Sequence, residues 1–223
     1  MKTKRIGVLV SGGGSNLQAL LDAQAQGALG PGEIALVISS HPGVYALTRA
    51  QNAGVPTRVI NRKEIPDRRA YSQAVLEALQ ACAIDIVAYA GFLVILDGCV
   101  ADAFPNRMVN VHPALIPSFC GAGAYGLKVH QSALDYGVTV TGATVHLVTA
   151  QVDGGPILLQ KAVEVQPDDT AQSLQKRVME QAEWILLPKA VRLLCEDRVH
   201  VDGRKVTIQP RTIQKNREEG EGI

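Results

Sequence analysis

The sequence has few aromatic residues, almost no net charge and no long apolar run, and each shortage excludes a class of protein. Aromatic residues make up 4% of the 223 residues, which disfavours the base-stacking surfaces of single-strand nucleic-acid binders. Lysine and arginine number 22 against 21 acidic residues, so electrostatic capture of nucleic acid or a membrane is not expected. The apolar run at 84–96 is interrupted by Asp85 and Gly91 and is too short to cross a bilayer.

Cysteine pairs and a leader are also missing. Cys82, Cys99, Cys120 and Cys195 form no CxxC pair and no zinc-ligand spacing, so we expect reduced thiols and no metal site. The basic N-terminus runs directly into a short apolar segment, without the long apolar stretch and cleavage site of a signal peptide. We therefore expect a cytoplasmic protein with small-molecule partners and no nucleic acid or membrane. Nothing in the sequence distinguishes a monomer from a homodimer.

Apolar runs of strand length alternate with helical segments through the first half of the chain. The run at 6–10 has the continuous apolarity of a strand covered on both faces, and further strands are expected at 34–38, 56–60, 84–90 and 108–111. Helical spacing follows at 44–52, at 67–81 and after the glycines at 12–14, where Ser15 or Asn16 is the expected cap. This alternation predicts an α/β fold with a Rossmann-like, mostly parallel sheet and helices on both faces.

The second half is less regular. We expect a helix at 127–136, strands at 142–148 and 157–165, and a long helix that opens at 168–170. Asp202-Gly203 predicts a turn between two short strands. No repeat or linker is visible, so we expect a single domain at 1–210 and a polar, loose C-terminal tail at 211–223.

A glycine-rich turn stands between the first strand and its helix. Such a turn presents backbone N–H groups and the positive end of a helix dipole to an anion. Leu17 replaces the third glycine of a dinucleotide fingerprint, and the second strand ends in Ser39-Ser40 without an acidic residue. The loop therefore suits a smaller phosphate ester, with Ser15 and Asn16 as extra donors. A tight turn without a ligand remains the alternative.

The stretch Asn110-Val111-His112-Pro113 carries the main chemical interest. Side chains two apart on an extended strand face the same way, so Asn110 and His112 point together. An amide and an imidazole at a rigid strand end suit oxyanion stabilisation and proton transfer. Taken alone, the pattern is more typical of an Asn110 that caps a turn and a His112 that lies in the core.

Two further loops follow strands. Residues 91–96 are uniformly apolar after Gly91, which fits either core or the wall of a pocket for a flat heterocycle. Asp153 lies in an Asp-Gly-Gly-Pro turn after the strand at 142–148. In a parallel sheet both loops would lie at the carboxyl edge beside His112, where Asp153 would orient the imidazole and favour its protonated form.

The motifs occur in one order that resembles the phosphoribosylglycinamide formyltransferase family. They are Ser-Gly-x-Gly-Ser-Asn-Leu-Gln-Ala at 11–19, Ala-Gly-Phe at 90–92, Asn-x-His-Pro-x-Leu-x-Pro at 110–117, Thr-Gly-x-Thr-Val-His at 141–146 and Asp-Gly-Gly-Pro-Ile at 153–157. The resemblance extends from about residue 5 to about residue 194. It implies the formyltransferase fold and transfer of a formyl group from 10-formyltetrahydrofolate, a co-substrate, to the amine of phosphoribosylglycinamide in purine biosynthesis, without a metal.

The resemblance also implies roles for particular residues. Asn110, His112 and Asp153 match the catalytic residues of the family. The residues that match its ribonucleotide site are Gly14, Ser15, Asn16, Leu17, Gln18 and Glu183. The residues that match its folate site are Arg68, Leu93, Val94, Ile95, Leu96, Asn110, Thr149, Ala150, Gln151, Val152 and Asp153. Arg68 matches an arginine on a mobile loop.

Two departures from the family pattern stand out. Val94 replaces a basic residue found in many members, and the loop at 119–126 is long. The rival functions are those of another formyl-folate enzyme: a methionyl-tRNA formyltransferase, a formyltetrahydrofolate hydrolase or a sugar-nucleotide formyltransferase. A non-catalytic nucleotide sensor is the rival from a different class.

Overall fold

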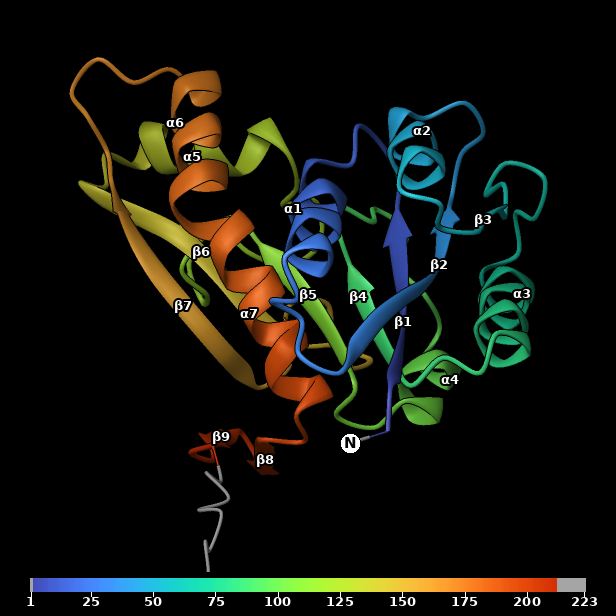
Figure 1. Ribbon diagram of the computed structural model, residues 1–223. Coiled ribbons are helices and arrows are strands. Elements are labelled where there is room, and N and C mark those ends of the chain that lie inside the picture. Colours follow the sequence, from blue (N-terminus) through green and yellow to red (C-terminus); the bar gives the residue numbers. More distant parts are fainter. Residues whose placement is uncertain (1, 212–223) are drawn as a thin grey trace, which may run out of the picture.

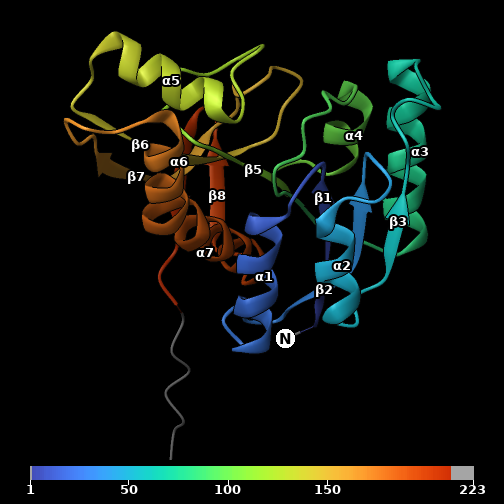
Figure 2. The same ribbon diagram turned by 90° about the horizontal axis from the view of Figure 1, so that it is seen from above.

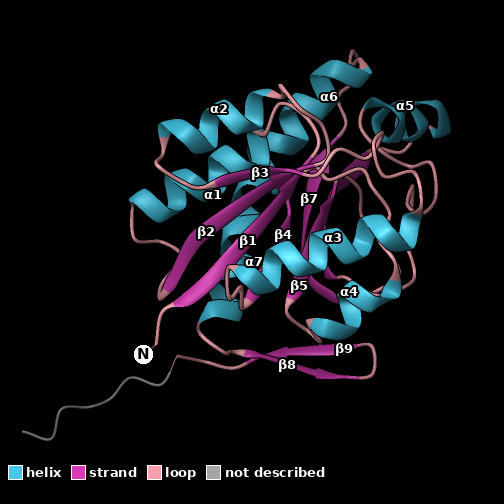
Figure 3. Cartoon of the chain, turned by 90° about the vertical axis from the view of Figure 1, so that its right-hand side faces the viewer, coloured by secondary structure: helices cyan, strands magenta, loops and turns pink. Residues whose placement is uncertain are grey.

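The computed structural model describes residues 2–211, which form a central seven-stranded sheet with helices on both faces and a separate small hairpin (Figures 1 and 3). The elements in chain order are β1 (Lys4–Val10), α1 (Ser15–Ala25), β2 (Gly32–Ser39), α2 (Tyr45–Asn52), β3 (Thr57–Val59), α3 (Arg68–Ala81), β4 (Ile86–Tyr89), α4 (Gly98–Ala103), β5 (Met108–His112), α5 (Leu127–Tyr136), β6 (Val140–Leu147), β7 (Ile157–Glu164), α6 (Ala171–Val178), the π-helix η1 (Met179–Glu183), α7 (Trp184–Cys195), β8 (Val199–Asp202) and β9 (Lys205–Ile208).

The sheet has the strand order β3-β2-β1-β4-β5-β6-β7, and the pairs from β3 to β5 are parallel. This confirms the expected Rossmann-like, mostly parallel sheet. The chain builds outward from β1 to β3 and then returns to place β4 on the other side of β1. The switch point between β1 and β4 is the position at which open α/β sheets bind ligands.

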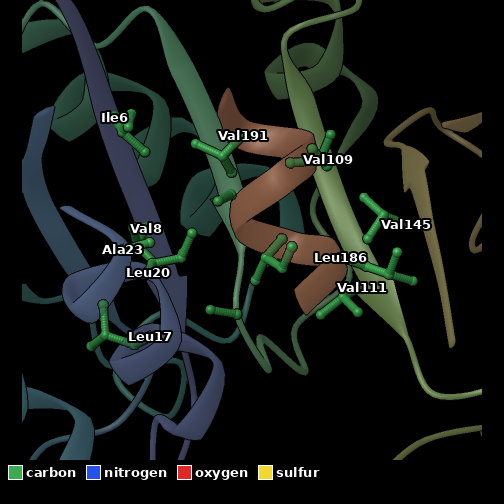
Figure 4. Packing of buried hydrophobic residues seen from close by; sticks show 14 of the residues in the cluster. Ile6, Val8, Leu17, Leu20, Ala23, Val109, Val111, Val145, Leu186 and Val191 are labelled. Carbon is green, nitrogen blue, oxygen red and sulfur yellow. The ribbon is translucent and has the colours of Figure 1, made fainter. Parts of the chain in front are cut away.

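Alternation along the strands divides the core into two layers. Ile6 and Val8 of β1 pack with α1 and α7 on one face, whereas Leu9 packs with α3 on the other. Figure 2 shows α1, α2 and α7 on one side of the sheet and α3 and α4 on the other. Figure 4 shows Val109 and Val111 of β5 beside α7. Because both faces are covered, the central strands β1, β4 and β5 are mostly apolar and buried, as the sequence indicated.

The direction of β6 corrects one expectation. The helix α5 between β5 and β6 suggested a parallel crossover, but β6 pairs antiparallel to β5, with Val109 opposite Leu147 and His112 opposite Thr144. The segment after β6 therefore starts at the opposite edge of the sheet from the one predicted. It folds back over the sheet to reach the carboxyl end of β5.

Three smaller features differ from the sequence expectations. Neither Ser15 nor Asn16 caps α1, because the N-cap is Gly14 and no side chain caps the helix. The long C-terminal helix is interrupted by the π-helix η1, and the short helix α4 was not foreseen. The expected hairpin is confirmed as β8 and β9. The expected loose tail falls outside the described residues except for Arg211, so the boundary at 210 stays a prediction.

Candidate active site

A cavity of about 450 Å³ lies at the carboxyl end of the parallel strands. Its walls come from the segments that follow β4 and β5, from the long loop at 121–126, from the segment after β6, and from α1 and η1. The predicted catalytic, folate and ribonucleotide segments therefore contribute to one cavity. Among the described residues, no group of three or more His, Cys, Asp or Glu side chains could hold a metal ion.

The loops after β1 and β4 are joined at the switch point. The backbone N–H of Ser11 donates to the carbonyl of Gly91 over 3.1 Å, and the backbone N–H of Leu93 donates to Ser11 Oγ over 2.9 Å. These bonds hold the apolar segment at 93–96 beside the glycine turn. Ser15 and Asn16, which follow the turn, line the same cavity as this segment. A ligand there would therefore contact the segments that follow two adjacent strands.

Gly14 gives the glycine turn its shape. Its φ of +74° is left-handed, and a Cβ built on it would lie 2.7 Å from Ala46 Cβ, so both conformation and space require glycine. Because no side chain caps α1, the first backbone N–H groups of the helix are not occupied by a cap. The N-terminus of α1, with Ser15 and Asn16 lining the cavity, is suited to an anion.

Asn110 is oriented by a histidine that the sequence analysis did not select. Val109 and Val111 face α7, so Asn110 and His112 face the other side of the sheet. His146 Nδ1 lies 3.0 Å from the carbonyl of Leu147, and a proton on Nδ1 leaves Nε2 as an acceptor. Asn110 Nδ2 donates to that Nε2 over 3.2 Å. One N–H of the amide is thus fixed, and the other can donate to a substrate oxygen.

Asp153 reaches both histidines. Its Oδ2 lies 3.6 Å from His112 Nδ1, and its Oδ1 lies 3.5 Å from His146 Nε2. The backbone N–H of Gly121 donates to Oδ2 over 2.9 Å and ties the long loop to this carboxylate. Burial opposes ionisation of Asp153, but its polar contacts, among them the hydrogen bond from Gly121, lower its pKa below the ordinary value.

The protonation of His112 corrects a second expectation. Burial is the largest influence and lowers its pKa below the usual value, although Asp153 and the hydrogen bond to Phe119 act in the opposite direction. His112 Nε2 lies 2.9 Å from the carbonyl of Phe119 and donates to it. The ring is therefore neutral near pH 7, and the nitrogen free to take a proton, Nδ1, faces Asp153.

The cavity is also lined by a buried carboxyl group, that of Glu183. Asn16 Nδ2 donates to Glu183 Oε2 over 2.7 Å, and burial raises the pKa of Glu183 to about 7 while this hydrogen bond lowers it. Asn16 Oδ1 is buried without a hydrogen-bond partner among the described residues, and both side chains line the cavity. The π-helix η1 brings Glu183 to this position, as such turns often do at functional sites.

Some of the remaining predicted residues line the cavity, and others lie outside it. Leu93 to Leu96 and Thr149 to Asp153 line the cavity. Gly14, Leu17, Gln18 and Arg68 do not: Leu17 is fully buried in the core, and Gln18 donates to Asp22. Arg68 is the first residue of α3 and not part of a loop, and its guanidinium donates to the carbonyl of Leu96 over 2.6 Å.

His146 and His130 also line the cavity, although sequence reasoning gave neither of them a role. His146 closes the motif at 141–146, but its position opposite Asn110 follows only from the antiparallel pairing. His130 lines the cavity, and neither of its ring nitrogens has a partner among the described residues. Burial lowers the pKa of His130 to about 4, so its ring is neutral.

Comparison with known proteins agrees with this arrangement. The family model described as formyl transferase matches residues 4–191, and the chain belongs to this family. It is 33% identical to phosphoribosylglycinamide formyltransferase of Haemophilus influenzae, covering 96% of this chain and 97% of that protein. The crystal structure of glycinamide ribonucleotide transformylase 1 from Symbiobacterium toebii superposes with a TM-score of 0.87 at 44% identity, covering 93% of this chain and 95% of that one.

A longer relative is also similar. The trifunctional purine biosynthetic protein adenosine-3 of Bos taurus is 44% identical over 90% of this chain, which spans 19% of that protein's length. The similarity thus includes proteins in which this unit is about a fifth of the whole. No helix within residues 2–211 is long and apolar enough to cross a membrane.

Proposed function

We propose that the protein transfers the formyl group of 10-formyltetrahydrofolate to the amine of phosphoribosylglycinamide. The observation that carries the proposal is that one cavity is lined by Asn110, His112 and Asp153 and also by the hydrogen-bonded Asn16–Glu183 pair. The first three residues form a polar set suited to acyl transfer. The pair lies at the helix N-terminus suited to a phosphate ester.

The lining residues fit the two substrates. A phosphate ester at the N-terminus of α1 would place its ribose beside Glu183, whose carboxyl group can bond to hydroxyl groups. The apolar segment at 93–96 fits a flat heterocycle, and the loop at 149–153 lines the same cavity. The reacting amine and formyl carbon would then meet near Asn110. We therefore place the glycinamide ribonucleotide beside Glu183 and the N-terminus of α1, and the folate beside the segment at 93–96.

The chemistry follows from the central residues. The amine nitrogen forms a bond to the formyl carbon, and the bond from that carbon to N10 of the folate breaks. The free N–H of Asn110 donates to the formyl oxygen as negative charge grows on it. His112 Nδ1 takes the proton that the amine releases, stabilised by the carboxylate of Asp153, and returns it to N10 of the leaving tetrahydrofolate. Burial keeps His112 neutral beforehand, which suits it to accept this proton.

An absorbance assay of formyl-folate consumption tests the proposal. Consumption should require phosphoribosylglycinamide and should fall by at least 100-fold in His112→Ala or Asp153→Asn variants. Consumption that ignores the ribonucleotide would overturn the proposal in favour of a hydrolase. Near wild-type turnover in both variants would overturn the assigned roles.

A further inference from the structure

The cavity lacks the positive side chains that an anionic substrate would require. None of its lining residues within the described chain is lysine or arginine, whereas Asp97, Asp153 and Glu183 all line it. A phosphate ester carries up to two negative charges near neutral pH. Backbone N–H groups at the start of α1 can bind such a group. A compensating charge must therefore act from outside the lining.

The helix α2 packs against the outer side of the glycine turn. The backbone N–H of Ala46 donates to the carbonyl of Gly12 over 3.2 Å. A Cβ added to Gly14 would lie only 2.9 Å from Ala46 Cα, so the backbones of the turn and of α2 approach each other closely. The shape of the turn therefore depends on the first turns of α2.

Arg49, one helical turn after Ala46, binds the glycine turn directly. Its Nε donates to the carbonyl of Gly13 over 2.9 Å, and its Nη1 donates to Gln18 Oε1 over 2.8 Å. The guanidinium also lies over the ring of Tyr45, 4.7 Å from its centroid. Arg49 and Ser15 also line a second pocket together. These contacts tie the guanidinium to the glycine turn through Gly13 and to α1 through Gln18.

We propose that Arg49 is the positioning residue of the phosphate site, rigidifying the glycine turn and supplying the positive charge that the cavity lacks. A carbonyl oxygen repels a phosphate oxygen, and the Gly13 carbonyl is engaged by the guanidinium. With Gln18 held by the same guanidinium, the turn and the first turn of α1 move as one unit. This inference rests on the proposed function, because it assumes that the anion bound at the turn is the substrate phosphate.

The test compares Arg49→Gln, Arg49→Lys and the control Arg58→Gln, which removes an exposed arginine on β3. We expect Arg49→Gln to raise the KM for phosphoribosylglycinamide about tenfold, the loss expected when a charged hydrogen bond is removed. The kcat and the KM for formyl-folate should change less than about twofold because Arg49 lies outside the reacting centre. Arg49→Lys keeps the charge but not the paired donors and should lie between the wild type and Arg49→Gln.

Competitive inhibition by inorganic phosphate isolates the anion site from the rest of the substrate. Its Ki should rise in parallel with the ribonucleotide KM in Arg49→Gln and stay unchanged in Arg58→Gln. An unchanged phosphate Ki in Arg49→Gln would overturn the inference, and so would equal effects on both substrates, which would indicate a general loosening of the fold. Thermal denaturation checks that each variant is folded. If the wild type ignores the ribonucleotide altogether, the proposed function fails instead.

Discussion

The buried carboxyl group of Glu183 makes the stability of the protein depend on pH. Glu183 is 6% exposed, and burial raises its pKa from 4.5 to about 7. Between these values the folded protein holds a proton that the unfolded chain has released, so stability falls as the pH rises. Each pH unit in this window costs about 1.4 kcal/mol. The loss therefore reaches roughly 3 kcal/mol by pH 7 and stays constant above it.

Replacing Glu183 by glutamine should remove this dependence. The amide is neutral at every pH and can still accept the hydrogen bond from Asn16. We expect Glu183→Gln to match the wild type in urea unfolding near pH 4.5 and to exceed it by roughly 3 kcal/mol at pH 8. The control is Glu180→Gln on the same π-helix, where the exposed Glu180 lies 3.8 Å from Lys176. Its effect should stay within about 0.5 kcal/mol at every pH. A difference between Glu183→Gln and wild type that does not change from pH 5 to pH 8 would refute the reasoning.

Three further substitutions examine the rest of the site. Asn110→Ala should lower kcat about 100- to 1000-fold in the formyl-transfer assay, since it removes an oxyanion donor; a loss seen only in KM would contradict that role. His146→Phe keeps the ring but not the acceptor for Asn110, so kcat should fall about tenfold with KM nearly unchanged; full activity would show that the amide needs no such support. Gly14→Ala should lower the free energy of unfolding by about 1–3 kcal/mol, because of its left-handed φ and the contact with Ala46, and weaken phosphate inhibition. Wild-type values in both unfolding and phosphate titrations would contradict this last expectation.

Much of the fold could be predicted because most strands are covered on both faces. Continuous apolar runs located β1, β2, β4 and β5, and the helices between them implied parallel pairing. The same reasoning failed at β6, because a helix between two strands is typical of a parallel crossover. Here the connection at 113–139 contains α5 and still joins antiparallel strands. Direction in such a case depends on tertiary packing and not on the local pattern.

The site was predicted less completely than the fold. Asn110 and His112 could be paired from the strand period alone, and the glycine turn from its composition. The contact of Asp153 with His112 could not, because it depends on the return path of the segment after β6. The net effect on the pKa of His112 also required knowledge of burial, which outweighs the neighbouring carboxylate.

The antiparallel pairing of β5 and β6 is what assembles the catalytic set. It places His146 opposite Asn110 and Thr144 opposite His112. Thr144 Oγ1 donates to the carbonyl of Ala114 over 2.7 Å and accepts from the backbone N–H of Ile116 over 3.1 Å, which holds the chain that leaves His112. The strand β6 thus orients the amide of Asn110 through His146 and holds the chain that follows His112 through Thr144. The segment after β6 then returns so that Asp153 Oδ2 lies 3.6 Å from His112 Nδ1 and Asp153 Oδ1 lies 3.5 Å from His146 Nε2. The antiparallel strand and the segment that follows it therefore supply groups that contact both Asn110 and His112.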